Sequence, residues 1–429
     1  MRNWFKRKKK SKAKIDKWQS GALKLLLCAE FEEEPNTMNY SIGKRWKVLC
    51  GKNNWDGLMD PLDHDLRRYI IHYGEMAQAS YDNFNFNKVS KNAGNNRYSK
   101  DDLFAKVGLD IGNPFKYRVT KYFYATSSIE VPEAFIIQSL SRESWSKESN
   151  WIGYIAVSTD EGKVALGRRE ILISWRGTVQ TLDWVDDLDF FQVSAPKIFR
   201  GNTAPKIHRG WYSIYSSEDP RSPFNKTSAR DQVIEEVKRL AEEYKSEEIS
   251  ITITGHSMGA AVGTLNAIDI VVNGFNKGCL VTAFLFASPK VGDSNFKNAF
   301  SNLENLRILR VSNALDIVPN YPMIDYSEIG VELIIDTTKS RYLKVPGDVR
   351  SWHSLEVHMH GVAGFQGANK CGFKLEVGRD ISLVNKHLDA LKDEYCVPTC
   401  WWVEKNNGMV QQDDGSWNLM DHENDDEDD

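Results

Sequence analysis

The residues best able to do chemistry are the pentapeptide GHSMG at residues 255–259, which places Ser257 between two glycines. The preceding run ISITIT (residues 249–254) alternates isoleucine with hydroxyl residues, as a strand does. The following run MGAAVGTLNAIDIVV (residues 258–272) has the small residues of a closely packed helix. A serine on a sharp strand-to-helix turn is held exposed, and flanking glycines let the neighbouring elements approach. This context predicts that Ser257 is a nucleophile, against the alternative of a glycine-rich turn with an incidental serine.

A serine nucleophile needs a carboxylate downstream if the chain follows the order Ser, Asp, His that is typical of α/β-hydrolases. The apolar run at residues 306–311 predicts a strand, and Asp316 lies in the loop just beyond it. A buried carboxylate there would orient an imidazole. The alternatives are that Asp316 only caps a turn, or that Asp325 or Asp336 takes this role.

Two histidines are candidates for the general base. His353 begins the segment WHSLEVHMHG after a loop with proline and glycine, and His360 follows two helical turns later on the same expected helix face. We predict His353 as the base, with His360 as the alternative, and a structural role for His358. The three histidines lack a matching carboxylate or cysteine partner, so no metal site and no cofactor are predicted.

The oxyanion of an ester intermediate needs two N–H donors. The residue after the nucleophile, Met258, supplies one at the start of the predicted helix. The run ILISW (residues 171–175) predicts an earlier strand, and the RGT that follows it puts Thr178 in place for the second donor. The alternative is that this loop is a simple strand-end turn.

The elements around these motifs alternate between strands and helices. Helical spacing occurs within residues 55–84 and 230–245, and further apolar strands are expected at residues 280–286, 306–311 and 331–335. This order predicts an α/β fold with a mainly parallel central sheet and helices on both faces. In such sheets the functional residues collect at the carboxyl ends of the strands.

The two ends of the chain differ in charge. Residues 1–20 hold nine Lys or Arg, and the last nine residues hold seven acids, although the net charge is only -4. We therefore expect a basic, loosely ordered leader at residues 1–45, one hydrolase domain at residues 46–412, and an acidic tail at residues 413–429. The composition favours neither nucleic acid nor a membrane span, and six sparse cysteines favour reduced thiols. The N-terminus resembles a secretory signal only superficially, so the cytoplasm is the expected compartment; peripheral membrane association through the basic leader and targeting to an organelle are the alternatives. No feature specifies an oligomeric state.

Several segments carry a resemblance to a known family. The runs WRGT, KIHRGWYSIY, GHSMGAAVGTLNAIDI, FASPKVGDSNF and RVSNALDIVP resemble the class 3, or fungal-type, lipases. The runs WDGLMDPLDHDLRRYIIHYGEMAQASYD, SRESWSKESNWIGYIAVSTDE and CWWVEKNNGMV are similar to the plant class II phospholipase A1 group. That group usually has leucine where this chain has Met258, and the exchange conserves volume.

The resemblance implies an α/β-hydrolase that cleaves the sn-1 ester of phospholipids at a membrane or micelle surface without a metal. It assigns the family's serine, aspartate and histidine to Ser257, Asp316 and His353. Other readings are a broader acylglycerol or galactolipid lipase, a carboxylesterase for small esters, and an inactive lipase-like scaffold. Residues 186–206, with Phe190, Phe191, Ile198 and Phe199, are either a lid that meets lipid or a packed surface loop.

Overall fold

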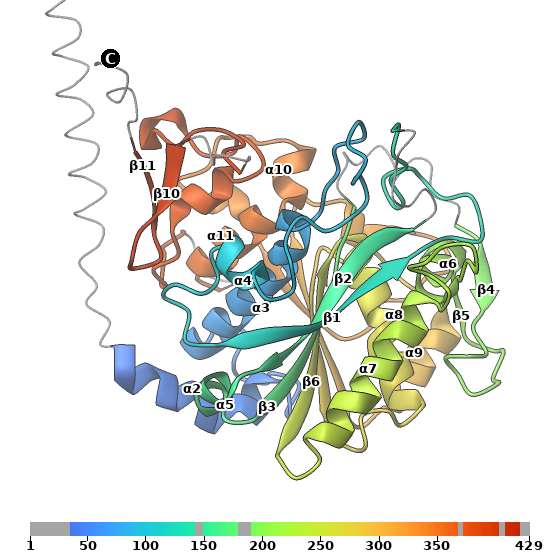
Figure 1. The fold of residues 1–429 in the computed structure, drawn as a ribbon. Helices are drawn as coiled ribbons and strands as arrows, with labels where there is room; N and C mark the ends of the chain where they lie inside the picture. The colour runs from blue at the N-terminus through green and yellow to red at the C-terminus, as the bar shows by residue number, and fades with distance from the viewer. Residues whose placement is uncertain (1–34, 142–148, 179–189, 368–371, 403–407, 421–429) are drawn as a thin grey trace, which may run out of the picture.

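A computed structural model of the chain describes residues 35–141, 149–178, 190–367, 372–402 and 408–420. A seven-stranded sheet crosses the molecule in the order β1-β2-β3-β6-β7-β8-β9 (Figure 1). Strands β3, β6, β7, β8 and β9 run parallel to one another, whereas β1 and β2 are antiparallel additions at one edge. The strands are β1 Tyr117–Ala125, β2 Asn150–Ser158, β3 Arg169–Trp175, β6 Ile249–His256, β7 Leu280–Phe286, β8 Leu306–Asn313 and β9 Val331–Ile335.

Helices cover both faces of this sheet. Helices α3 (His64–Asp82) and α11 (Leu355–Gly364) lie on one face, and α8 (Met258–Val272), α7 (Ala229–Glu243) and α6 (Arg209–Ser216) lie on the other (Figure 1). The remaining helices are α2 Pro35–Leu49, α4 Leu103–Lys106, α5 Asp160–Leu166, α9 Ser294–Ser301 and α10 Val349–His353. The α/β fold with a mainly parallel sheet and helices on both faces is therefore confirmed.

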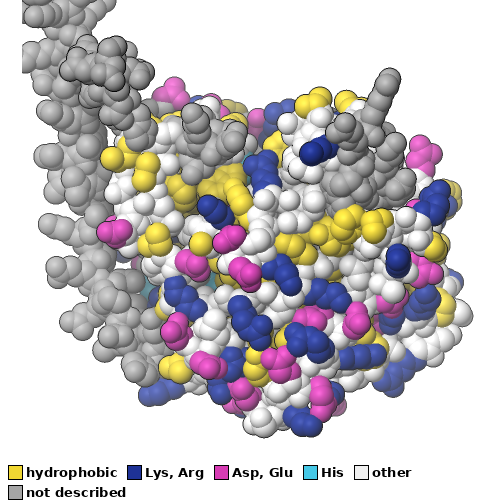
Figure 2. Space-filling view, viewed as in Figure 1, with side chains coloured by type: hydrophobic (Ala, Val, Ile, Leu, Met, Phe, Trp, Pro, Cys, Tyr) yellow, Lys and Arg dark blue, Asp and Glu magenta, His cyan; other side chains and the backbone are white. Residues whose placement is uncertain are grey.

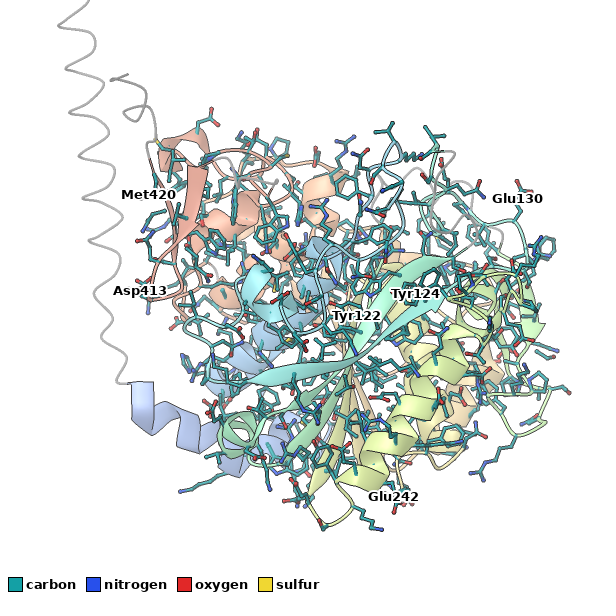
Figure 3. All side chains as sticks on the ribbon, viewed as in Figure 1. Tyr122, Tyr124, Glu130, Glu242, Asp413 and Met420 are labelled. Carbon is teal, nitrogen blue, oxygen red and sulfur yellow. The ribbon has the colours of Figure 1, made fainter. Side chains whose placement is uncertain are left out.

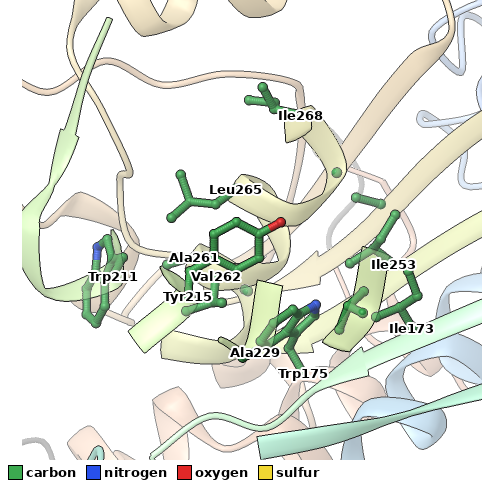
Figure 4. Packing of buried hydrophobic residues seen from close by; sticks show 14 of the residues in the cluster. Ile173, Trp175, Trp211, Tyr215, Ala229, Ile253, Ala261, Val262, Leu265 and Ile268 are labelled. Atoms are coloured by element: carbon green, nitrogen blue, oxygen red, sulfur yellow. The ribbon is translucent and has the colours of Figure 1, made fainter. Parts of the chain in front are cut away.

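The isoleucine and hydroxyl residues that alternate in β6 (ISITIT) meet different surroundings on the two faces of the sheet. Ile251 and Ile253 belong to the core beneath α8, where they pack with Trp175, Leu265 and other apolar side chains (Figure 4). The hydroxyl positions face α3 instead: Thr254 Oγ1 donates to the carbonyl of Tyr73 at 2.8 Å. Burying a hydroxyl costs little free energy when it is hydrogen-bonded, so β6 can be buried on both faces, between α8 and α3.

A buried ion pair ties the C-terminal part of the chain to α3. Lys386 Nζ lies 2.5 Å from the carboxylate of Asp82, and His387 Nε2 lies 2.8 Å from the same carboxylate. Lys386, which follows the short 3-10 helix η4 (Ile381–Asn385), pulls the pKa of the buried Asp82 below its usual value, against desolvation. This pair is called the Asp82–Lys386 clamp below.

The ends of the expected domain differ from the structure. Helix α2 begins at Pro35, and Ile42 is fully buried, so the folded part starts inside the segment expected to be a leader. The hairpin of β10 (Met409–Gln411) and β11 (Trp417–Leu419) spans the expected start of the acidic tail, with Asp413 and Met420 beside it (Figure 3). Residues 1–34 and 421–429 lie outside the described residues, so the leader and the tail stay predictions.

The segment expected to be a lid divides into unlike parts. Residues 186–189 lie outside the described residues, and Phe190 and Phe191 are 47% and 69% exposed. Ile198 and Phe199 are buried in the core beneath α8, so these two belong to a packed loop. A small hairpin of β4 (Gln192–Ser194) and β5 (Lys206–His208) closes this loop at its ends.

Charges of both signs are interspersed over the lower part of the face in Figure 2. No helix among the described residues is long and apolar enough to cross a bilayer.

Candidate active site

The turn between β6 and α8 holds Ser257 in a rare backbone conformation. Its φ of 58° and ψ of −128° lie where most side chains are strained, and such strain is typical of a nucleophile held on a sharp turn. Gly259 makes the turn possible, because a Cβ there would lie 2.3 Å from the carbonyl oxygen of Trp175. Ser257 itself is fully buried, so the exposure expected of a serine on such a turn is not observed.

One histidine reaches the serine. His353 Nε2 lies 2.9 Å from Ser257 Oγ, and His353 Nδ1 lies 2.8 Å from Asp316 Oδ2. The other oxygen of Asp316 accepts the N–H of Val318 at 3.0 Å, and the carboxylate is fully buried. The structure thus brings together residues from the β6–α8 turn, the loop after β8 and the end of α10 in a hydrogen-bonded chain, which we call the Ser257–His353–Asp316 chain.

The carboxylate fixes which nitrogen of the imidazole carries the proton. An ionised Asp316 can only accept, so Nδ1 of His353 donates to it and Nε2 is left with its lone pair toward Ser257. The serine hydroxyl then donates to Nε2. This is the arrangement in which a histidine can remove the proton of a serine as general base.

The alternative base lies elsewhere. His360 belongs to α11, and its Nε2 is 2.8 Å from Ser340 Oγ rather than near Ser257. Burial lowers the pKa of His360 to about 3, so it is a neutral core residue. The expectation that His353 and His360 share one helix face was wrong, because Ser354 has an extended backbone that separates α10 from α11.

His358, predicted to be structural, and the alternative carboxylate Asp336 have local partners of their own. His358 Nδ1 lies 2.9 Å from the Ser354 carbonyl, and its Nε2 is 3.8 Å from Asp316 Oδ2, behind the chain that reaches the serine. Asp336 caps a short 3-10 helix through Thr338 N–H at 3.1 Å. Neither residue bonds His353 or Ser257 among the hydrogen bonds of the described residues. Among all the residues that the structure describes, no group of three or more His, Cys, Asp or Glu side chains is arranged to hold a metal ion.

Two backbone segments adjoin the nucleophile. Met258 is the first residue of α8, and the first N–H groups of a helix have no partner within it. The loop after β3 runs directly beside the turn, because Trp175 pairs with Gly255 and a Cβ on Gly177 would lie 2.4 Å from the carbonyl of His256. Thr178 follows in this loop. The structure thus sets both predicted donor segments next to Ser257.

A buried arginine holds the second of these segments. Arg176 donates from Nη1 to the carbonyl of Gly177 at 2.7 Å and from Nε to that of Trp151 at 3.1 Å. Its guanidinium lies 3.8 Å from the centre of the Phe84 ring. Burial lowers the pKa of Arg176 to about 9, with no carboxylate bonded to it among the described residues. The loop conformation is therefore fixed by a charge that the fold spends energy to bury.

The chain is similar in sequence to several known proteins. Residues 172–326 match the family model described as lipase (class 3). The chain is 59% identical over 396 residues to phospholipase A1-IIgamma of Arabidopsis thaliana, which covers 90% of this chain and 94% of that protein. It is 53% identical over 388 residues to phospholipase A1-II 1 of Oryza sativa subsp. japonica, with 90% and 98% covered. A triacylglyceride lipase structure from Rhizomucor miehei aligns with a TM-score of 0.42 and 20% identity, over 70% of this chain and 94% of that one.

Proposed function

Because the chain belongs to the phospholipase A1-II family, we propose that it is an acylhydrolase that cleaves the sn-1 ester of phospholipids. The observation that carries the proposal is the Ser257–His353–Asp316 chain, with 2.9 Å and 2.8 Å between its hydrogen-bonded atoms. Its order along the sequence is Ser, Asp, His, as in α/β-hydrolases. A carboxylic ester hydrolase is the chemistry that this geometry supports best.

The first half of the reaction forms an acyl-enzyme. His353 Nε2 takes the proton of Ser257 as Oγ attacks the ester carbonyl carbon, and Asp316 stabilises the imidazolium that results. The carbonyl oxygen becomes an oxyanion beside the N–H groups of Met258 and Thr178, whose dipoles favour the negative charge. The tetrahedral intermediate then breaks the bond to the alcohol, and His353 returns the proton to the leaving lysophospholipid oxygen.

The second half releases the fatty acid. A water molecule gives its proton to His353 and attacks the acyl carbon, and the same two N–H groups bind the second oxyanion. Collapse of this intermediate breaks the bond to Ser257, which regains its proton from His353. The products are a fatty acid and a lysophospholipid, and no metal or cofactor takes part in these steps.

An apolar rim near the site supports action on a lipid surface. The rim comprises Phe190, Phe191, Leu315, Ile317, Met323 and Ile324, which are 39% to 79% exposed. Leu315 and Ile317 flank the carboxylate of Asp316 in sequence. The loops adjoin each other, because the Phe190 and Tyr321 rings stack with 6.5 Å between centroids and Tyr326 Oη donates to the Phe190 carbonyl at 3.1 Å. We expect these side chains to enter the apolar part of a bilayer or micelle.

A substrate profile tests the proposed reaction. Purified protein should react with a fluorophosphonate probe, and Ser257→Ala should abolish both labelling and turnover. Phospholipids labelled separately in the two acyl positions should release fatty acid from sn-1. Exclusive release from triacylglycerol or galactolipid would move the assignment to a broader lipase, and absence of labelling would favour the inactive scaffold.

A second experiment tests the apolar rim. Phe191→Ser and Ile324→Ser should weaken vesicle binding and lower turnover of micellar phospholipid, while hydrolysis of a dissolved short-chain ester stays unchanged. Val164→Ser on α5 is the matched control, because Val164 is 72% exposed and α5 precedes β3, at the amino end of the parallel strands, whereas the rim follows their carboxyl ends. Equal losses on micellar and dissolved esters would contradict the lipid-surface role and favour a carboxylesterase. The cytoplasmic location expected from the sequence stays a prediction.

A further inference from the structure

His353 is the last residue of α10, so its position depends on what bonds the carbonyl groups at the end of this helix. A helix leaves its last carbonyls without partners inside the helix, and α10 has only five residues. Two side chains at the carboxyl ends of β8 and β6 fill these positions: Asn313 Nδ2 donates to the Trp352 carbonyl at 3.0 Å, and His256 Nε2 lies 2.7 Å from the His353 carbonyl. The segment carrying His353 is thus bonded to the strand that precedes Asp316 and to the residue before Ser257.

The contact to the His353 carbonyl fixes the state of His256. A carbonyl oxygen only accepts, so Nε2 of His256 carries the hydrogen. Nδ1 is then an acceptor, and Tyr81 Oη lies 2.7 Å from it and donates. Burial, together with His353 and His358, holds the pKa of His256 well below its usual value, so the ring stays neutral. Both ring nitrogens of His256 are satisfied in a single tautomer.

Tyr81 also lies against the loop of the second oxyanion donor. A Cβ on Gly177 would lie 2.1 Å from the Tyr81 hydroxyl, which shows how closely this residue packs there. Burial raises the pKa of Tyr81, so the hydroxyl keeps the proton that it donates to His256. Tyr81 is on the last turn of α3, an element separate from both the β6–α8 turn that carries Ser257 and the helix α10 that carries His353. One hydroxyl thus connects α3 to both halves of the site.

We propose that His256 and Tyr81 are positioning residues for His353. His256 fixes the backbone of the base, and Tyr81 selects the tautomer in which His256 can do so. Neither residue bonds Ser257 Oγ or the imidazole of His353 among the hydrogen bonds of the described residues. The inference rests on the proposed hydrolase function, since it assumes that His353 Nε2 is the base.

Two substitutions of His256 separate positioning from bulk. In His256→Gln the side-chain amide can place an N–H where Nε2 was, whereas in His256→Asn the shorter amide reaches only the place of Nδ1. Misplacing a reacting group by about 1 Å costs about a hundred-fold in rate, so we expect His256→Asn to lower kcat about ten-fold to a hundred-fold. KM should stay unchanged, and His256→Gln should retain most of the activity.

Tyr81→Phe provides a second test with a smaller structural change. Without the hydroxyl, His256 is free to adopt the other tautomer, so kcat should fall several-fold at unchanged KM. In the His256→Gln background the same change should have less effect, because no tautomer remains to be selected. Tyr154→Phe is the matched control: it removes another buried hydroxyl that bonds α3, at 2.7 Å from the Met76 carbonyl, and should leave kcat unchanged.

The measurements are kcat and KM on a dissolved ester, the rate of fluorophosphonate labelling, and the free energy of unfolding in urea. The inference is supported if kcat and the labelling rate fall most in His256→Asn, several-fold in Tyr81→Phe and little in His256→Gln, while KM is unchanged. It is overturned if His256→Asn equals His256→Gln, or if every loss of activity follows a loss of stability. A wild-type protein that is neither labelled nor active would instead refute the proposed function itself.

Discussion

Lowering the pH from 7 to 5 should destabilise this protein, because four buried histidines stay neutral in the folded state. These are His72, His256, His358 and His360, each at most 6% exposed. Burial lowers the pKa of His72 and of His360 to about 3, and it lowers the pKa of the other two as well. In the unfolded chain each returns to a pKa of about 6.5.

The sign follows from proton binding. Between pH 7 and pH 5 the unfolded chain takes up a proton at each of these histidines, and the folded chain does not, so stability rises with pH in this window. His72 and His360 have folded pKa values of about 3, so each lowers the free energy of unfolding of the protein by about 2 kcal/mol between pH 7 and pH 5. Together they remove about 4 kcal/mol, a large share of a typical 5–15 kcal/mol. Carboxyl groups of an unfolded chain titrate near pH 4, below this window.

Urea unfolding followed by tryptophan fluorescence at pH 7, 6 and 5 measures the effect. His360→Gln should reduce the pH dependence by about 2 kcal/mol, since an amide keeps a partner for Ser340 but takes up no proton. His72→Gln should do the same independently. A stability that is flat between pH 7 and 5, or that falls equally in wild type and both variants, would refute this reasoning.

Other perturbations act on the site and on the buried ion pairs. Asp316→Asn should lower kcat about 10⁴-fold with little change in KM, because the amide favours the wrong tautomer of His353; steady-state kinetics on a dissolved ester measure it. Gly177→Ala should lower kcat about a hundred-fold, since its Cβ would meet the Tyr81 hydroxyl at 2.1 Å; Gly378→Ala, with open space around it, is the control. Arg168 and Glu170 form a second, fully buried ion pair, and Glu170→Ala should cost about 3–5 kcal/mol in urea unfolding, because the Arg168 guanidinium loses its carboxylate partner. A smaller loss would mean that water or a tyrosine hydroxyl compensates.

Much of the parallel sheet could be predicted from local patterns. The apolar runs at residues 280–286 and 331–335 coincide with β7 and β9. Strands β1 and β2 were not predicted, although the YRVTKYFYA of β1 alternates and includes Tyr122 and Tyr124 (Figure 3). All residues of β2 are buried, so this strand shows no alternation of apolar and polar positions. The antiparallel edge therefore had no signal as clear as that of β6.

The parts of the site that could be predicted are those that follow from the order of residues along the chain and from their positions after strands. Ser257 and Asp316 follow strands directly, but the choice between His353 and His360 depended on a helix break at Ser354 that spacing does not reveal. The roles of His256 and Tyr81 were missed for a different reason. Their contacts join residues 175 and 97 positions apart, and only the folded sheet brings them together.

The Asp82–Lys386 clamp bears on how the protein comes into being. Tyr81 and Asp82 are translated early and His353 and Lys386 late, so a nascent chain carries Ser257 long before its base can be fastened in place. The ribosome-bound intermediate then lacks a working nucleophile. The hydrogen bond between Ser257 and His353, and the contact of Lys386 with α3, can therefore form only after most of the polypeptide has been synthesised.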